Sequence, residues 1–139
     1  MDKLFLDANV ILDFFCERSD FYLPAAKLLV KSYNKEIELW CSPISLATAS
    51  YFMEKGNVDA TEIFRKISDM TTLCGVSKID RGVVEKALAS DFKDFEDALQ
   101  YFSAEQCNAD IIITRNKKDF MASMKPVLTP TEYLDIHKE

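Results

Sequence analysis

The sequence predicts an α/β fold, a three-layer α/β/α sandwich with a short, mainly parallel central sheet, and three observations favour it. Short apolar segments alternate with longer segments of helical periodicity along the chain, which is typical of βαβ units. The strongest strand candidate, Ile111-Ile112-Ile113, is β-branched and continuously apolar, which indicates burial on both faces of a parallel sheet. A length of 139 residues suits one domain, so we expect a single unit over 1–139.

The predicted strands are short and lie at intervals along the chain. They occupy residues 4–6, 37–41, 73–76, 111–113 and 127–128. The first of them ends at Asp7, and a helix is expected to start near Asn9. Helices connect strands of a parallel sheet in right-handed crossovers, so we expect helices to cover both faces.

The predicted helices rest on apolar stripes with three- and four-residue spacing. These stripes are Tyr22, Ala26, Leu29, Val30 and Tyr33; Ala60, Ile63, Phe64 and Ile67; Val83, Val84, Ala87 and Leu88; and Phe95, Ala98, Leu99 and Phe102. We expect the stripes to face the core. Two further helix starts are marked by polar caps followed by proline, at Ser42-Pro43 and at Thr129-Pro130-Thr131-Glu132, the latter with the form of a capping box.

Composition excludes several classes of catalytic site. The only histidine, His137, stands near the end of the chain, which excludes Ser-His-Asp and Cys-His chemistry. Four widely spaced cysteines without a CxxC pair are expected to be buried free thiols. The sequence has no leader-like start and no apolar run of about 20 residues. We therefore expect a cytoplasmic protein that has no signal peptide and does not contact a membrane.

The net charge is −6, which by itself argues against nucleic-acid binding, because phosphate neutralisation requires positive charge. Two arrangements of charged residues would allow an acidic protein to bind nucleic acid. Acidic residues gathered at one site recruit divalent cations, and basic residues can gather locally despite the overall balance.

Acidic side chains follow two of the predicted strands and open one of the predicted helices. Asp7 follows the first strand, Asp94 and Asp97 lie in the first turn of a helix, and Asp119 lies just beyond the strand at 111–113. Parallel strands bring their carboxyl ends to one edge of the sheet, where α/β folds build their sites. Two carboxylates about 4 Å apart repel by roughly 4 kcal/mol at an effective dielectric near 20. A divalent cation relieves this repulsion, and oxygen ligands without histidine or cysteine select Mg²⁺ or Mn²⁺.

A simpler reading of these acids stays open. Asp94 and Asp97 suit a helix N-cap and a partner for the helix dipole. Asp119 suits a surface turn.

The motifs LDANVILD, DFEDALQ and ADIIITRNKKDF together resemble those of PIN-domain ribonucleases, and in particular the small bacterial VapC-like toxins. The resemblance covers the chain from Leu4 to the last helix. It implies a compact α/β/α domain in which carboxylates bind Mg²⁺ or Mn²⁺ and single-stranded RNA is cleaved. It also implies a homodimer and a small basic antitoxin protein as partners. By this resemblance Asp7 and Asp97 are catalytic metal ligands, and Asp119 or the position of Asn116 supplies the last ligand.

Two positions depart from the family pattern. Thr48 stands where the family commonly has glutamate, and Asn116 stands where many members have aspartate. Asp94 or Glu96 would compensate for the missing charge. Asn9 and Thr114 are expected to position the ligands, unless they only serve as cap and turn residues.

Three basic residues, Arg115, Lys117 and Lys118, lie beside the acids in the sequence and are candidate phosphate contacts, although loop lysines more often face solvent.

Three alternative functions were weighed against this one. A haloacid-dehalogenase-type phosphatase needs an acid two residues after the first one, where this chain has Asn9. A receiver domain needs an acidic pair near the N-terminus, which the sequence lacks. A PIN fold that binds RNA or protein with weak or no catalysis remains open because of Thr48 and Asn116.

Overall fold

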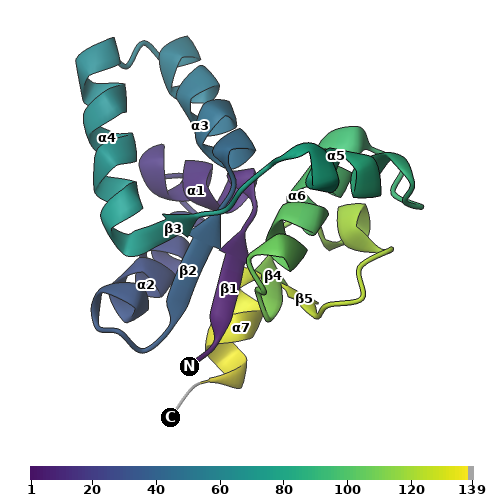
Figure 1. Cartoon of the computed structure of the whole chain (residues 1–139). Coiled ribbons are helices and arrows are strands. Elements are labelled where there is room, and N and C mark those ends of the chain that lie inside the picture. The colour runs from purple at the N-terminus through teal and green to yellow at the C-terminus, as the bar shows by residue number, and fades with distance from the viewer. Residues whose placement is uncertain (138–139) are drawn as a thin grey trace.

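The structure, a computed structural model, describes residues 1–137 and contains a five-stranded parallel sheet. The strands are β1 (Lys3–Leu6), β2 (Glu38–Cys41), β3 (Cys74–Val76), β4 (Ile111–Ile113) and β5 (Val127–Leu128). They lie in the order β3-β2-β1-β4-β5, and every pairing is parallel (Figure 1). The predicted sheet is therefore confirmed, with β2 and β3 each starting one residue later than expected.

Helices connect the strands and close the chain. They are α1 (Ala8–Phe15), α2 (Tyr22–Tyr33), α3 (Pro43–Lys55), α4 (Ala60–Leu73), α5 (Arg81–Leu88), α6 (Phe95–Gln106) and α7 (Pro130–Ile136), with a 3₁₀ turn at Lys117–Phe120. The predicted caps are confirmed: Ser42 accepts a hydrogen bond from the Ser45 amide, and Thr129 and Glu132 form a capping box. Within residues 1–137, no helix combines the length and the apolar character needed to cross a membrane.

The core consists of two layers of side chains, one on each face of the sheet. Alternate residues of β1 point to opposite faces, so Leu4 and Leu6 pack with the helices α1 to α4 and α7, while Phe5 packs with Tyr101 of α6. Helix α5 packs on α6 through residues such as Val83. The arrangement is the predicted three-layer α/β/α sandwich (Figure 1).

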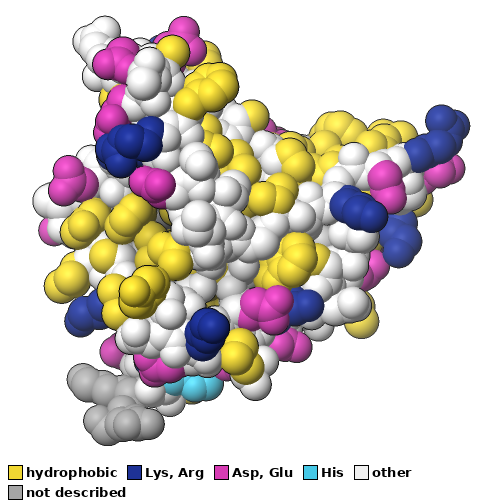
Figure 2. Space-filling view, turned by 60° about the vertical axis from the view of Figure 1, so that its left-hand side comes forward, with side chains coloured by type: hydrophobic (Ala, Val, Ile, Leu, Met, Phe, Trp, Pro, Cys, Tyr) yellow, Lys and Arg dark blue, Asp and Glu magenta, His cyan; other side chains and the backbone are white. Residues whose placement is uncertain are grey.

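Several apolar residues that the helical stripes assigned to the core lie at the surface. Phe64 is 76% exposed and Phe95 is 50% exposed, and Val30, Tyr33 and Leu88 are also exposed. The apolar stripes predicted the helices correctly, but each stripe includes residues that lie outside the face that the helix buries. Figure 2 shows a face on which hydrophobic side chains lie among charged ones.

The cysteines are free thiols, as predicted. Cys41, Cys74 and Cys107 are buried, whereas Cys16 is exposed, contrary to expectation, because it lies at the C-terminal end of α1.

Gly75 in β3 supplies the space that the Trp40 ring occupies on β2. A Cβ atom at residue 75 would lie 2.8 Å from Trp40 Cδ2 and Cε2. We expect Gly75→Ala to lower the free energy of unfolding by about 1–3 kcal/mol, because the ring must move. In the control variant Gly82→Ala, the added Cβ meets Asp80 Oδ1 at 3.4 Å, and the helical position favours alanine by roughly 0.5–1 kcal/mol. Urea unfolding measures both, and equal stability of Gly75→Ala and wild type would contradict the packing described.

Candidate active site

The candidate site lies at the carboxyl edge of the sheet, where β1, β4 and α6 meet. Leu6 and Ile113 are register partners, and the Asp7 amide donates to the Ile113 carbonyl oxygen at 2.9 Å. The residues that follow the two strands, Asp7 and Thr114, are therefore neighbours. Helix α6 starts at this edge with Asp94 as its N-cap, whose carboxylate accepts from the Asp97 amide at 2.9 Å. The simpler reading of Asp94 as a cap is therefore confirmed.

The Asp7 carboxylate is buried and accepts four hydrogen bonds. Its Oδ1 accepts from the Ala8 amide at 2.8 Å and from Gln100 Nε2 at 3.2 Å. Its Oδ2 accepts from Thr114 Oγ1 at 2.8 Å and from Asn9 Nδ2 at 3.3 Å. Burial raises the pKa of Asp7 and outweighs the hydrogen bonds from Thr114, Ala8 and Gln100, which lower it, and the charge of Asp119 raises it further. Asn9 and Thr114, which were expected to position the ligands, both contact Asp7.

Gln100 ties Asp7 to helix α3 through a buried network that the sequence reasoning did not identify. Its side chain is 1% exposed. Gln100 Nε2 donates to Ser45 Oγ at 2.7 Å as well as to Asp7, and Gln100 Oε1 accepts from the Ser42 hydroxyl. The sequence does carry one sign of this role: Gln100 is a polar residue among the apolar neighbours Ala98, Leu99 and Tyr101, which indicates a polar group inside the core. Gln100 therefore sets the position of the Asp7 carboxylate relative to α3 and α6.

Replacing Gln100 by leucine should lower the free energy of unfolding by about 1–3 kcal/mol, because Asp7 and Ser42 each lose a buried partner. The matched control is Gln106→Leu on the same helix. Gln106 is exposed and accepts one long hydrogen bond from the Lys78 amide, so its replacement should stay within about 0.5 kcal/mol of wild type. Thermal unfolding without added metal measures both variants, and equal effects would show that the network carries no stability.

Asp97 and Asp119 line a common pocket at the N-terminal end of α6. The pocket has a volume of about 420 Å³ and is also lined by Asp94, Lys118 and other residues of the two flanking loops. Burial, followed by the charges of Asp94, Asp119, Asp7 and Glu96, raises the pKa of Asp97 to about 7. Burial and the charges of Asp94 and Asp7 also raise the pKa of Glu96. The acids predicted to converge are therefore close enough to influence one another, although Asp7 does not line this pocket.

The donor set at this edge fits a divalent cation in its chemistry. Its acidic groups are carboxylates, which are hard oxygen ligands suited to Mg²⁺ or Mn²⁺. Burial and then the charges of the neighbouring acids raise the pKa of Asp97, and a bound cation would relieve the repulsion among these charges. Among residues 1–137, no group of three or more histidine, cysteine or acidic side chains lies close enough together to hold a metal ion.

The remaining predicted site residues are placed as follows. Thr48 is half-buried on α3, whereas the α3 side chains that reach the Asp7 network are Ser42 and Ser45. Asn116 is exposed, and its backbone N–H donates to Thr114 Oγ1 at 3.0 Å.

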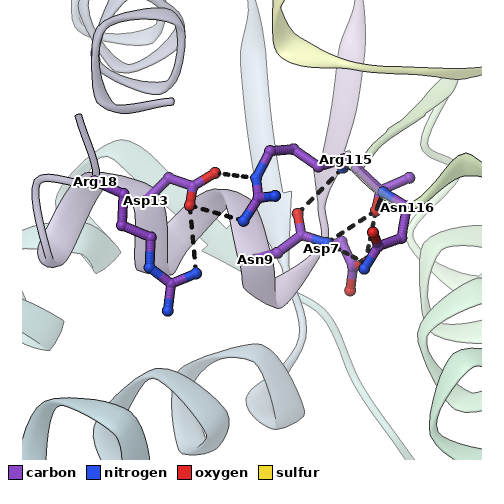
Figure 3. Close-up of polar contacts among 7 residues, drawn as sticks. Asp7, Asn9, Asp13, Arg18, Arg115 and Asn116 are labelled. Atoms are coloured by element: carbon purple, nitrogen blue, oxygen red, sulfur yellow. Dashed lines mark hydrogen bonds and ion pairs between the residues drawn. The ribbon is translucent and has the colours of Figure 1, made fainter. Parts of the chain in front are cut away.

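The basic residues that follow β4 have different surroundings. Arg115 turns to α1, where its Nε and Nη2 donate to Asp13 Oδ2 and Oδ1 at 2.6 and 3.1 Å (Figure 3). Lys117 pairs with Glu132 at 2.9 Å, away from the acids. Lys118 is exposed and lines the pocket that contains Asp97. Asp13, which is 1% exposed, is a second polar residue that the sequence reasoning missed.

Comparison with known proteins gives the family. The model of the PIN domain matches residues 3–118. The chain belongs to the PIN domain family. The match includes Asp7 and Asp97 and ends one residue before Asp119.

This PIN domain is similar in sequence to a ribonuclease and in fold to several solved structures. It is 28% identical to Ribonuclease VapC1 of Aquifex aeolicus (strain VF5), over 96% of this chain and 94% of the relative. Among solved structures, VapBC2 of Rickettsia felis bound to a promoter DNA fragment gives a TM-score of 0.66 at 17% identity, covering 91% of this chain and 96% of the other. A toxin–antitoxin complex from Klebsiella pneumoniae gives 0.66 at 20% identity, covering 91% and 97%. At these identities the structural matches establish the fold, which is the PIN fold that the sequence resembled.

Proposed function

We propose that this PIN domain is a metal-dependent endoribonuclease that cleaves single-stranded RNA and acts as the toxin of a toxin–antitoxin pair. The observation that carries the proposal is that Asp97 and Asp119 line one pocket at the N-terminal end of α6, where the charges of Asp119 and the buried Asp7 both act on Asp97. The likeness to Ribonuclease VapC1 over nearly the whole chain supports the same activity.

In this proposal Asp7, Asp97 and Asp119 hold Mg²⁺ or Mn²⁺, with Asp94, Glu96 or Asn116 nearby. When bound, the metal supplies an activated water and offsets charge on the phosphoryl oxygens. Thr114 and Asn9 fix the orientation of the Asp7 carboxylate through the bonds described above. Asp119, on the loop after β4, would accept the proton of the attacking water as the new P–O bond forms, and the leaving oxygen would take a proton from solvent as the old P–O bond breaks. Lys118 lines the same pocket and contacts a phosphate of the substrate.

A cleavage assay tests the proposal. Purified protein is incubated with a labelled single-stranded RNA in the presence of Mg²⁺, Mn²⁺ or EDTA, and a duplex of the same sequence serves as the control substrate. We expect cleavage of the single strand with either metal and none with EDTA. Metal-dependent binding without cleavage would instead support a non-catalytic PIN module, as the Thr48 and Asn116 positions allow. Cleavage that survives EDTA would contradict the mechanism.

For partners, we propose a small basic antitoxin and a homodimer of this chain. The overall charge of −6 and the anionic pocket favour a basic partner. An antitoxin peptide that reaches the acids should compete with Mn²⁺, and its affinity should fall when Asp97 is replaced by asparagine. Calorimetric titration with and without Mn²⁺ measures this competition, and sedimentation measures the oligomeric state.

A further inference from the structure

A second pocket lies beside the acidic site, on the other side of Asn9. It has a volume of about 300 Å³ and lies between α1, the start of α2, the second residue after β4 and the start of α7. Its lining residues are Asp13, Phe21, Pro24, Arg115, Thr129, Pro130 and Thr131. We call it the Phe21–Arg115 pocket. The volume is at the lower end of the range for small-molecule sites.

The polar wall of this pocket contains a buried ion pair, Asp13 with Arg115, and Arg18, which lies outside the lining, also pairs with Asp13. Asp13 is 1% exposed and pairs with two arginines, Arg115 at 2.6 Å and Arg18 at 3.5 Å (Figure 3). Two cations share one buried anion, so the cluster has a charge of about +1. Arginine has five N–H donors, and the two hydrogen bonds from Arg115 to Asp13 leave the others available to an anionic ligand. Asp13 thus holds the guanidinium in place without neutralising the cluster.

The apolar wall presents an aromatic ring at the surface. The Phe21 side chain is 42% exposed, and the Arg115 guanidinium lies over its ring, 4.0 Å from the centroid. The guanidinium covers one face of the ring, and the exposed remainder of Phe21 offers a surface on which an unpaired base can stack while its phosphate binds the arginine.

A continuous series of contacts links this pocket to Asp7. The Arg115 amide donates to Asn9 Oδ1 at 3.2 Å, and Asn9 Nδ2 donates to Asp7 Oδ2 at 3.3 Å and to Thr114 Oγ1 at 3.2 Å (Figure 3). Arg115 is also the residue that follows Thr114 in the chain. The pocket and Asp7 are therefore joined through one side chain, Asn9, and through the adjacent residues Thr114 and Arg115.

We propose that the Phe21–Arg115 pocket binds one nucleotide of a single-stranded RNA, with the base against Phe21 and a phosphate on Arg115, next to the nucleotide held at the acidic site. The inference rests on the proposed function, because the acidic site defines where the strand passes. It adds a subsite that selects unpaired RNA, since a base must leave a duplex to reach the ring.

The test measures binding without cleavage, so that it does not depend on catalysis. The probe is a fluorescently labelled 2′-O-methyl oligouridine hexamer, titrated in EDTA. Phe21→Leu should weaken binding by about fivefold to 100-fold, the range for loss of one base–aromatic stack. Phe21→Tyr, which keeps the ring, should bind like wild type. Phe64→Leu is the control, because Phe64 is an exposed phenylalanine on α4 that does not line the pocket.

An abasic residue placed at each position of the hexamer in turn separates stacking from a general effect on the fold. At one position the missing base should weaken binding to wild type and leave binding to Phe21→Leu unchanged. The proposal is overturned if Phe21→Leu binds the hexamer like wild type, or if every abasic position weakens both proteins equally. It is also overturned if Phe21→Leu loses only a protein partner, which would make the pocket a protein-docking site. Binding that depends on Phe21 in a protein that does not cleave RNA would refute the proposed catalysis and leave the subsite intact.

Discussion

Replacing Asp7 by asparagine should lower the rate of RNA cleavage by at least ~100-fold, because loss of a metal ligand removes several kcal/mol of transition-state stabilisation. The buried carboxylate accepts from Thr114 at one oxygen and from Gln100 at the other. Asparagine keeps only one oxygen, so one of these donors would face an amide nitrogen, which cannot accept. The substitution therefore also disturbs the orientation of the remaining groups. Initial rates on a labelled single-stranded RNA, measured in Mn²⁺, give the effect.

The matched control for Asp7→Asn is Asp20→Asn, at an exposed position before α2, which should cleave at the wild-type rate. Thermal unfolding of both variants shows whether the fold is retained. Wild-type activity in Asp7→Asn would remove Asp7 from the mechanism.

Replacing Asp97 by asparagine should stabilise the metal-free protein at neutral pH and remove its response to metal. Aspartate ordinarily titrates near 3.8, whereas burial and the neighbouring acids raise the pKa of Asp97 to about 7. Between these values the folded state holds a proton that the unfolded state has lost. The stability of the wild type should therefore fall as the pH rises from about 4 to about 7. Asp97→Asn has no such group, so its stability should change less over this window.

Metal should stabilise the wild type and leave Asp97→Asn unaffected. A hundredfold excess of metal over its Kd stabilises a folded protein by about 2.7 kcal/mol, so the Tm of the wild type should rise in Mn²⁺ while that of Asp97→Asn should not. The control Asp20→Asn should follow the wild type in both the pH series and the metal series. A wild-type Tm that ignores millimolar Mn²⁺, or a pH dependence that Asp97→Asn leaves unchanged, would contradict the account of this site.

The fold was predictable because its signals are local. The β-branched run Ile111–Ile113 and the cap at Ser42-Pro43 each depend on a few neighbouring residues, and both are present in the structure. The position of Asp7 at the site followed from topology alone, since parallel strands end at one edge. Burial was less predictable, because a helix such as α4 covers the core with a narrower stripe than its apolar residues suggest, which leaves Phe64 exposed.

The connections within the site were not predictable because they join residues far apart in the chain. The Gln100–Asp7 bond spans 93 positions and the Arg115–Asp13 pair spans 102. Neither contact has a periodic signal, and both depend on the packing of α6 and α1 on the sheet. The same applies to Lys117, whose sequence neighbours suggested a phosphate contact and whose side chain pairs with Glu132 on α7.

The central claim is that Asp7, Asp97 and Asp119 form one binding site for a divalent cation, and Mn²⁺ binding measured by electron paramagnetic resonance tests it most directly. The signal of aqueous Mn²⁺ is recorded while wild type, Asp7→Asn, Asp97→Asn, Asp119→Asn or the control Asp20→Asn is added. The account predicts that wild type and the control reduce the signal of the free ion and that each of the three site variants binds more weakly. Equal binding by wild type and all three site variants, or no binding by any protein, would contradict it.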